Sequence, residues 1–425
     1  MSHISIHNIG PIKDINIELN RINIFMGPQS SGKSTIAKII SFCQWLEKDC
    51  VVRQSTDHIT NSFIYDNFII YHNISSYIED SSEFHYKGAA LNIDFSKEKT
   101  NISKAAKFSS TPISKNAYIP SERNIAFIPR ISSLDLTRNY LRSFLFDWLG
   151  IRTKFTKDDE IGIVDMGVKY YYNEAQKKDK LVIESNDCET EIDMEQASSG
   201  LMSITPLYAY LTYLTSWIYS HNEDRSYETD QKIKDGLRRR LAEKEINIPE
   251  SVFDTYIRTH ESQPITFDAK TESDNNPTSV IIQKLQAEFW RPKYSSIIIE
   301  EPEQNLFPDT QARLLYHIFA MINQNRDNLL ITTHSPFILY ALNNCMLAWN
   351  KSGAKENCNN LEFSYESFIN PHNVAVWELR NGYIEDVNGK RNVTIQDESG
   401  LIRDNYFDRV MSNIMSDFYS LMGNK

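Results

Sequence analysis

The sequence predicts an α/β protein with a central parallel sheet, an antiparallel β region and a helical lobe. Two apolar runs, 297–299 and 329–331, are short and uninterrupted, which is typical of parallel strands that are covered on both faces. A third apolar strand, 22–26, is followed in 34–45 by apolar residues at helical spacing. Short alternating runs within 4–19 and within 61–101 predict antiparallel strands.

Further elements follow from the same patterns. In chain order we expect antiparallel strands at 4–6 and 15–19, β runs at 68–71 and 91–95, a helix at 134–149, a hairpin of 168–172 with 181–184, a charged and mainly helical segment at 222–278, a second hairpin of 374–379 with 383–387 around Asn381-Gly382, and a last amphipathic helix from about 405.

Composition bounds the class of protein. A chain of 425 residues is longer than one ordinary core needs, so we expect one large domain with insertions, or two lobes. The net charge of −11 and the lack of a polybasic tail argue against indiscriminate coating of nucleic acid, although a local basic patch could still touch DNA. The five cysteines show no metal spacing, and no targeting or membrane-spanning segment is evident. We therefore expect a soluble, cytoplasmic protein that does not contact a membrane.

A phosphate-binding loop lies between the strand at 22–26 and the helix after it. The pattern GxxxxGK[ST] requires that context, in which glycines let backbone N–H groups wrap around phosphate oxygens. Lys33 is expected to reach the β- and γ-phosphates of ATP, and the Ser34 hydroxyl to bind Mg²⁺. The nine expected nucleotide-binding residues of this loop are Gly27, Pro28, Gln29, Ser30, Ser31, Gly32, Lys33, Ser34 and Thr35.

Paired carboxylates follow the strand at 297–299. The carboxyl end of a strand in an open α/β sheet is where ligands bind, so Glu300 and Glu301 read as a Walker B element. Glu300 is expected to hold Mg²⁺ through water, and Glu301 to orient and deprotonate the water that attacks the γ-phosphate. The alternative is an ordinary strand whose solvated end happens to carry two glutamates.

His334 ends the next apolar strand, in the segment Thr332-Thr333-His334-Ser335-Pro336. A histidine at the same sheet edge is placed to hydrogen-bond the γ-phosphate or the attacking water, and so to sense intact ATP. A lone histidine after a strand is more often only a capped or packed side chain. We favour the sensor role because the two earlier motifs accompany it.

A fourth segment, Ala197-Ser198-Ser199-Gly200-Leu201-Met202-Ser203, precedes the apolar stretch 204–219. By itself it reads as the start of a helix, because serines cap helices well. Together and in this order, however, the four segments resemble those of the ABC-type ATPase domains of OLD and RecF/SMC-like proteins. The resemblance runs from residue 4 to about 342 and implies an ABC-type P-loop NTPase.

In that family the signature segment of one subunit meets the ATP held by another. The resemblance therefore implies that Ser198, Ser199 and Gly200 contact a γ-phosphate in trans, and that ATP joins two or more copies of the chain. A helix N-terminus with free hydroxyls is a suitable partner for phosphate. We expect an ATPase domain at 1–350, with a helical lobe and insertion at about 198–290, and a C-terminal extension at 351–425.

Several features depart from the family pattern. Glu300 stands where many ABC proteins have aspartate, which we interpret as specific to the OLD-like branch. The loop Gln304-Asn305-Leu306-Phe307 lacks the two histidines of the OLD-like form. The chain has no room for long SMC-type arms, and the part after His334 carries no Asp-x-Asp cluster of a Toprim nuclease.

Two basic features have open interpretations. The segment 118–123 resembles a stretch where the lobes of these ATPases meet, so Arg123 is expected either to reach a phosphate or an interface acid, or to form an ordinary surface ion pair. The basic run within 232–244 could face nucleic acid or an acidic partner, although such a run is more often a solvated helix face. Its members are Lys232, Lys234, Arg238, Arg239, Arg240 and Lys244.

Three functions are compatible with these motifs. The first is an ATP-hydrolysing oligomer that controls a separate effector such as a nuclease, as in the ATPase components of the PARIS and Septu anti-phage systems that the chain resembles. The second is a RecF/SMC-like repair ATPase that clamps DNA. The third is a scaffold that is switched by ATP and Mg²⁺ without appreciable hydrolysis.

Overall fold

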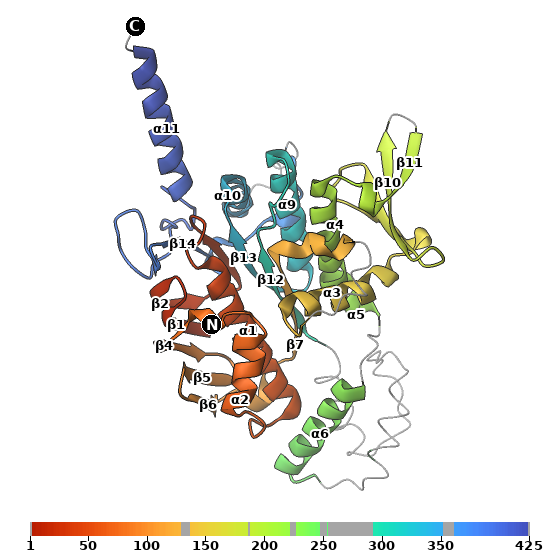
Figure 1. Ribbon diagram of the computed structural model, residues 1–425, viewed down its shortest axis with the longest axis vertical. Helices are drawn as coiled ribbons and strands as arrows, with labels where there is room; N and C mark the ends of the chain where they lie inside the picture. The colour runs from red at the N-terminus through yellow and green to blue at the C-terminus, as the bar shows by residue number, and fades with distance from the viewer. Residues whose placement is uncertain are drawn as a thin grey trace.

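The computed structural model describes residues 2–128, 137–185, 188–221, 227–246, 253, 292–351 and 361–423. Its main feature is an eleven-stranded sheet in the order β6-β5-β4-β1-β2-β15-β14-β3-β13-β12-β7, and a separate four-stranded sheet lies near the helical lobe (Figure 1). The predicted α/β fold class, with a mixed central sheet, an antiparallel β region and helices, is confirmed. Among the described residues, every helix is too short or too polar to cross a bilayer.

The parallel half of the large sheet contains the strands that carry the motifs. Each neighbouring pair in the series β14, β3, β13, β12 and β7 is parallel, so all five strands end at the same edge of the sheet. Their bounds are β3 Ile22–Met26, β7 Ser114–Ile119, β12 Tyr294–Glu300, β13 Asn328–Thr333 and β14 Val374–Arg380.

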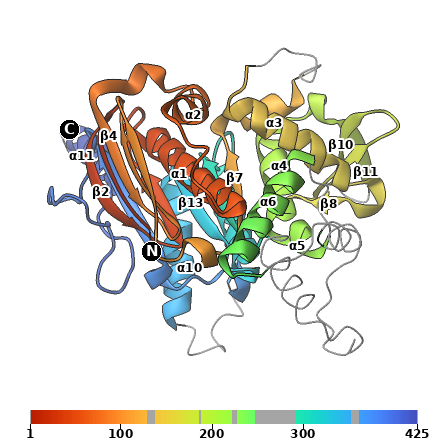
Figure 2. The same cartoon turned by 90° about the horizontal axis from the view of Figure 1, so that it is seen from below.

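The central strands β3, β13 and β12 are buried along almost their whole length because both faces of the sheet are covered. On β12, Ile297 and Ile299 belong to a core shared with the helices α9, α10 and α4, whereas Ile298 belongs to a core shared with α1. Figure 2 shows α1 on one side of the strands. The bounds of the principal helices are α1 Lys33–Arg53, α3 Tyr140–Ile151, α4 Ser199–Thr212, α6 Tyr227–Glu243, α9 Pro308–Gln324 and α10 Pro336–Lys351.

The other half of the large sheet is antiparallel, as the alternating N-terminal runs predict. It comprises β1 Ser2–Ile9, β2 Ile12–Leu19, β4 Ile78–Lys87, β5 Leu91–Ser96 and β6 Thr100–Lys104. The hairpin predicted at 168–184 is also confirmed and belongs to the small sheet, whose strands are β8 Ile161–Gly162, β9 Val168–Asn173, β10 Lys178–Ser185 and β11 Cys188–Asp193.

The β run predicted at 68–71 is wrong. Residues Asn61–Ile64 form the short helix α2, and Tyr65–Ile70 continue it as the π-helical turn η1. The Thr60 side chain caps the start by accepting a hydrogen bond from the backbone N–H of Phe63. Phe68 then packs against Phe42 of α1. A short apolar run has no periodicity that separates a strand from a buried helical turn, so this contact with α1 decides the outcome.

The C-terminal segment enters the large sheet. Its predicted hairpin is present as β14 with β15, Tyr383–Ile384. Asn381 and Gly382 between them both have positive φ, as the tightest hairpin turns require. β14 pairs with β3 along five residues, so a boundary at residue 350 separates strands of one sheet. The last predicted helix is also present, as α11 Tyr406–Gly423.

The segment predicted as mainly helical at 222–278 is helical where it is described. α6 packs against α1, and a Cβ atom on Gly236 would lie 1.9 Å from the carbonyl oxygen of Val52, so the close contact needs a glycine. The remainder of the prediction, at 222–226, 247–252 and 254–278, lies outside the described residues. The turns η9 Tyr213–Trp217 and α5 Ile218–Ser220 extend α4.

Candidate nucleotide-binding site

The phosphate loop has a backbone that requires glycine at both glycine positions of the pattern. Gly27 and Gly32 have φ values of +149° and +105°, which side chains disfavour. A Cβ atom on Gly27 would also lie 2.4 Å from the carbonyl oxygen of Leu379 on β14. Gln29 and Ser30 are exposed at the tip of the loop, whereas Ser31 and Thr35 are buried. The loop is thus fixed at its base and open at its tip.

Lys33 is folded back into this loop. Its Nζ atom donates to the carbonyl oxygens of Gly27 at 3.0 Å and Pro28 at 2.9 Å, and the side chain is only 4% exposed. Burial lowers the pKa of Lys33 to about 8, although the nearby carboxylates oppose the shift. Carbonyl dipoles therefore replace the water around this ammonium group. A bound polyphosphate would interact with it more strongly, because its oxygens carry full negative charges.

Glu300 lies at the buried end of β12, beside Ser34 at the start of α1. Its side chain is 3% exposed, its pKa is raised by burial, and Ser34 and Lys38 partly offset that shift. The Oε1 atom of Glu300 is buried without a hydrogen-bond partner. A buried carboxylate oxygen without a hydrogen-bond partner costs folding free energy. A proton or a cation bound at this atom would therefore stabilise the site.

The Ser34 hydroxyl and the Glu300 carboxylate are suited to bind Mg²⁺. Magnesium prefers hard oxygen ligands and usually takes only one or two from the protein, with phosphate oxygens and waters for the rest. The Ser34 hydroxyl and Glu300 carboxylate supply that number. In the described part of the chain, no group of three or more His, Cys, Asp or Glu side chains is placed to hold a metal.

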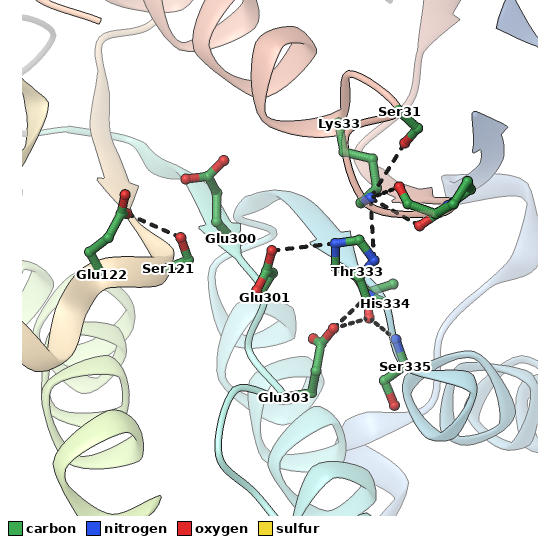
Figure 3. Close-up of polar contacts among 12 residues, drawn as sticks. Ser31, Lys33, Ser121, Glu122, Glu300, Glu301, Glu303, Thr333, His334 and Ser335 are labelled. Carbon is green, nitrogen blue, oxygen red and sulfur yellow. Dashed lines mark hydrogen bonds and ion pairs between the residues drawn. The ribbon is translucent and has the colours of Figure 1, made fainter. Parts of the chain in front are cut away.

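Glu301 and His334 face each other from the ends of neighbouring strands (Figure 3). His334 Nε2 lies 3.4 Å from Glu301 Oε1, and His334 Nδ1 lies 3.5 Å from Lys33 Nζ. The contact with His334 is the main reason that the pKa of Glu301 is lowered. With Lys33 protonated, Nδ1 must accept and Nε2–H must donate, so the imidazole links an ammonium group to a carboxylate that stays ionised.

Glu303 holds His334 in place, a role that the sequence motif did not indicate. Its Oε1 atom accepts from the backbone N–H of His334 at 2.6 Å and from the Thr333 hydroxyl at 2.9 Å. Burial raises the pKa of Glu303, and these two donors oppose the shift. The signal was available as the third carboxylate of Glu300-Glu301-Pro302-Glu303, but the sequence does not reveal that this one points toward the next strand.

Neither predicted role of Arg123 is found. The side chain is 0% exposed and begins in the 3₁₀ turn η4, Ser121–Phe127. Its guanidinium donates to carbonyl oxygens on three segments: Pro120, Ser203 of α4, and the loop residues Glu300, Glu301 and Pro302. Burial lowers its pKa to about 10. Arg123 therefore binds backbone rather than phosphate or a surface acid, and it fixes the loop that carries Glu301.

The signature segment, 197–203, leads into α4, whose first turn lies against the loop that follows Walker B. Ser198 caps α4, its hydroxyl accepting from the Leu201 N–H at 3.4 Å, and Ser198 and Ser199 are both exposed. A Cβ atom on Gly200 would lie 2.9 Å from the carbonyl oxygen of Asn305. The helix tip is thus seated on the loop that follows Walker B, with its hydroxyls directed outward. Figure 1 shows α4 and α1 on different sides of β12 and β13.

The fold and this site define a P-loop ATPase: a cradle with a buried lysine, a Walker B carboxylate pair and a histidine meet at one edge of a parallel sheet. More specifically, the chain belongs to the family described as "AAA ATPase domain", which matches residues 1–339. A search of curated proteins found no match.

Three solved structures that resemble the chain are distant from it in sequence. The SMC head domain from Thermotoga maritima is 8% identical, with 80% of this chain and 90% of that chain covered, at a TM-score of 0.31. MJ1267, an ATP-binding cassette of an ABC transporter, is 11% identical over 90% of each chain, at 0.27. The recombination mediator RecF is 12% identical over 90% of this chain and 96% of its own, at 0.27.

Replacing Arg123 by methionine should destabilise the protein strongly. The change leaves buried carbonyl oxygens without donors, so the free energy of unfolding should fall by about 3 kcal/mol or more. The exposed Arg313, paired with Asp309 on α9, offers a matched control: Arg313→Met should cost less than about 1 kcal/mol. Urea unfolding followed by circular dichroism measures both. Equal effects of the two changes would contradict the bridging role of Arg123.

ATP binding should be coupled to protonation of Lys33. Phosphate charge raises the pKa of Lys33 above its value of about 8 in the free protein, so the complex binds more protons. Affinity should be constant well below pH 8 and weaken above it, by up to about tenfold per pH unit. Calorimetry at pH 8 in buffers of different ionisation enthalpy should detect uptake of about half a proton. An affinity that does not change between pH 7 and 9.5 would refute this coupling.

Proposed function

We propose that the chain hydrolyses ATP between two copies that face each other across their nucleotide sites. The observation that carries this proposal is the series Lys33, His334 and Glu301, in contact through the two nitrogens of one imidazole. This series connects Lys33, which is suited to bind the γ-phosphate, with Glu301, which is suited to deprotonate the attacking water. Glu301 stays ionised and partly exposed, as a general base must be.

In this proposal the roles of the side chains follow their positions. Lys33 turns from the loop carbonyls to the β- and γ-phosphates, while the Ser34 hydroxyl and the Glu300 carboxylate would hold Mg²⁺. When bound, Mg²⁺ neutralises charge that develops on the phosphate oxygens. Glu301 takes the proton of the attacking water as the bond from the γ-phosphorus to the bridging oxygen breaks. His334 donates from Nε2 and keeps Glu301 oriented.

The arrangement of α4 supports a site shared between two copies. The tip of α4 carries free backbone N–H groups and exposed hydroxyls, which suit a phosphate. Contact with Asn305 fixes this tip next to the chain's own Walker B loop. In that same loop, Phe307 is 83% exposed. An aromatic ring so exposed beside a phosphate-binding helix end fits burial against a second copy.

We propose in addition that this ATP-dependent assembly controls a separate effector protein, such as a nuclease, in anti-phage defence. The sequence resemblance to the PARIS and Septu ATPases supports this role. Direct clamping of DNA is the weaker alternative, because part of the basic run is used within the chain: Lys232 pairs with Asp49 and Glu228, Arg239 donates to the Arg53 carbonyl oxygen, and Arg240 is buried.

Glu301→Gln distinguishes a hydrolase from a switched scaffold. Glutamine still accepts a hydrogen bond from His334 but is a very poor base, so ATP should bind normally while turnover falls by about a hundredfold or more. Light scattering with ATP should then show a persistent dimer, whereas Lys33→Ala should remain monomeric. If Glu301→Gln and the parent protein show equal turnover and equal dimer lifetimes, the scaffold interpretation is favoured.

Mixing two inactive variants tests the shared site. Lys33→Ala removes the cradle, and Ser199→Arg places a bulky cation at the tip of α4. In a mixed dimer, one site combines both defects and the other has neither, so an equal mixture should recover roughly a quarter of the parent rate. Lys33→Ala mixed with Glu301→Gln should recover nothing, since both residues belong to the cradle side. Lack of recovery in the first mixture would contradict a site formed in trans.

A further inference from the structure

The helix α11 presents an apolar seam that the described part of the chain leaves largely exposed. Phe407, Met411, Ile414, Phe418 and Leu421 recur at intervals of four and three residues, which is the a/d spacing of a helix that packs along another helix. The four seam residues from Met411 onward are between 50% and 77% exposed. In proteins most of the stability of a helix comes from packing of its amphipathic face, so a covering surface would stabilise α11.

The base of α11 is fixed beside the phosphate loop. The backbone N–H of Tyr406 donates to Glu378 Oε2 at 3.0 Å, and Arg409 contacts the other oxygen of the same carboxylate. Glu378 is completely buried on β14 and is in register with Met26, the residue before Gly27. A hydrogen bond from Tyr340 of α10 to Asp408, at 2.8 Å, holds the other side.

From this base, α11 projects away from the body, beyond α9 and α10, with the C-terminus at its far end (Figure 1). Its 18 residues span about 27 Å. It therefore starts at the edge of the sheet where the nucleotide site lies and extends past that edge. A second copy facing this edge would lie in its path.

The chemistry of α11 favours another copy of itself as the occupant. Residues 410–423 contain no Lys or Arg and only one acidic residue, Asp417. Helices that bind a membrane surface are usually rich in Lys and Arg on the polar face, but here that face carries Ser412, Ser416 and Ser420. With so little charge, two such helices can approach each other without electrostatic repulsion. The segment also offers no cluster of charged side chains to a partner that binds through charge.

We propose that the α11 helices of two copies pack together through this seam, as an antiparallel pair that adds to the ATP-dependent dimer. The inference rests on the proposed face-to-face arrangement. Copies that face each other direct their α11 helices toward opposite ends, which makes the pair antiparallel. The pairing lies outside the nucleotide site, so it sets how tightly the two copies associate rather than how each one binds ATP.

Two triple variants in the Glu301→Gln background test the seam. The seam variant is Met411→Glu/Ile414→Glu/Phe418→Glu, and the control, on the opposite face of the same helix, is Ser412→Glu/Ser416→Glu/Ser420→Glu. Both leave the base contacts of Tyr406, Asp408 and Arg409 intact. Circular dichroism establishes that the two are equally folded, and sedimentation equilibrium with saturating ATP and Mg²⁺ gives the dimer dissociation constant.

The seam variant should raise the dimer dissociation constant at least about tenfold, whereas the serine-face control should change it by less than about threefold. The affinity of the monomer for ATP should be the same in both. Equal dimerisation of the seam variant and the control would overturn the α11 inference alone and leave the shared nucleotide site standing. If the Glu301→Gln parent fails to dimerise with ATP, the proposed function is overturned and the inference with it.

Discussion

The ammonium group of Lys33, almost fully withdrawn from water, is the charge to which the rest of the nucleotide site is adjusted. Loop carbonyls and three neighbouring glutamates compensate for the lost hydration of this group. Those glutamates in turn need partners: Glu301 has His334, Glu303 has the backbone of the same histidine, and Glu300 has an oxygen with none. The unpartnered oxygen of Glu300 is thus suited to a cation, and the ammonium group of Lys33 is suited to a polyphosphate.

Arg123 extends this network to the scaffold. It is the one side chain described above that binds α4, the turn η4 and the Walker B loop together. Because its partners are carbonyl oxygens, its positive charge stays available to the field of the site, where it contributes to the lowered pKa of Glu301. Arg123 therefore connects α4 to the backbone of Glu301 through one guanidinium group.

The sequence was sufficient to predict those parts of the structure that depend on local pattern. Strands β3, β12 and β13 were predictable because an uninterrupted apolar run that ends in a polar motif is typical of a buried parallel strand. Arg123 was not, since whether an arginine meets carbonyls or a phosphate depends on segments about 80 and 180 residues away. The β run predicted at 68–71 was wrong for a similar reason, because Phe68 packs against Phe42, a residue that lies outside the local pattern. The roles assigned to the site residues remain predictions, although the structure brings Lys33, Glu300, Glu301 and His334 to one edge.

The insertion of β14 beside β3 has a consequence for the order of folding. The strand that leads into the phosphate loop, β3, acquires both of its neighbours from distant segments: β13 lies about 310 residues further along the chain and β14 about 350. During synthesis both hydrogen-bonding edges of β3 stay open until β13 is made, and one stays open until β14 follows with the Leu379 carbonyl that contacts the base of the loop. A nascent chain that ends before β14 would expose an unpaired strand, a known starting point for aggregation. The complete base of the phosphate loop therefore forms only after β14 has left the ribosome.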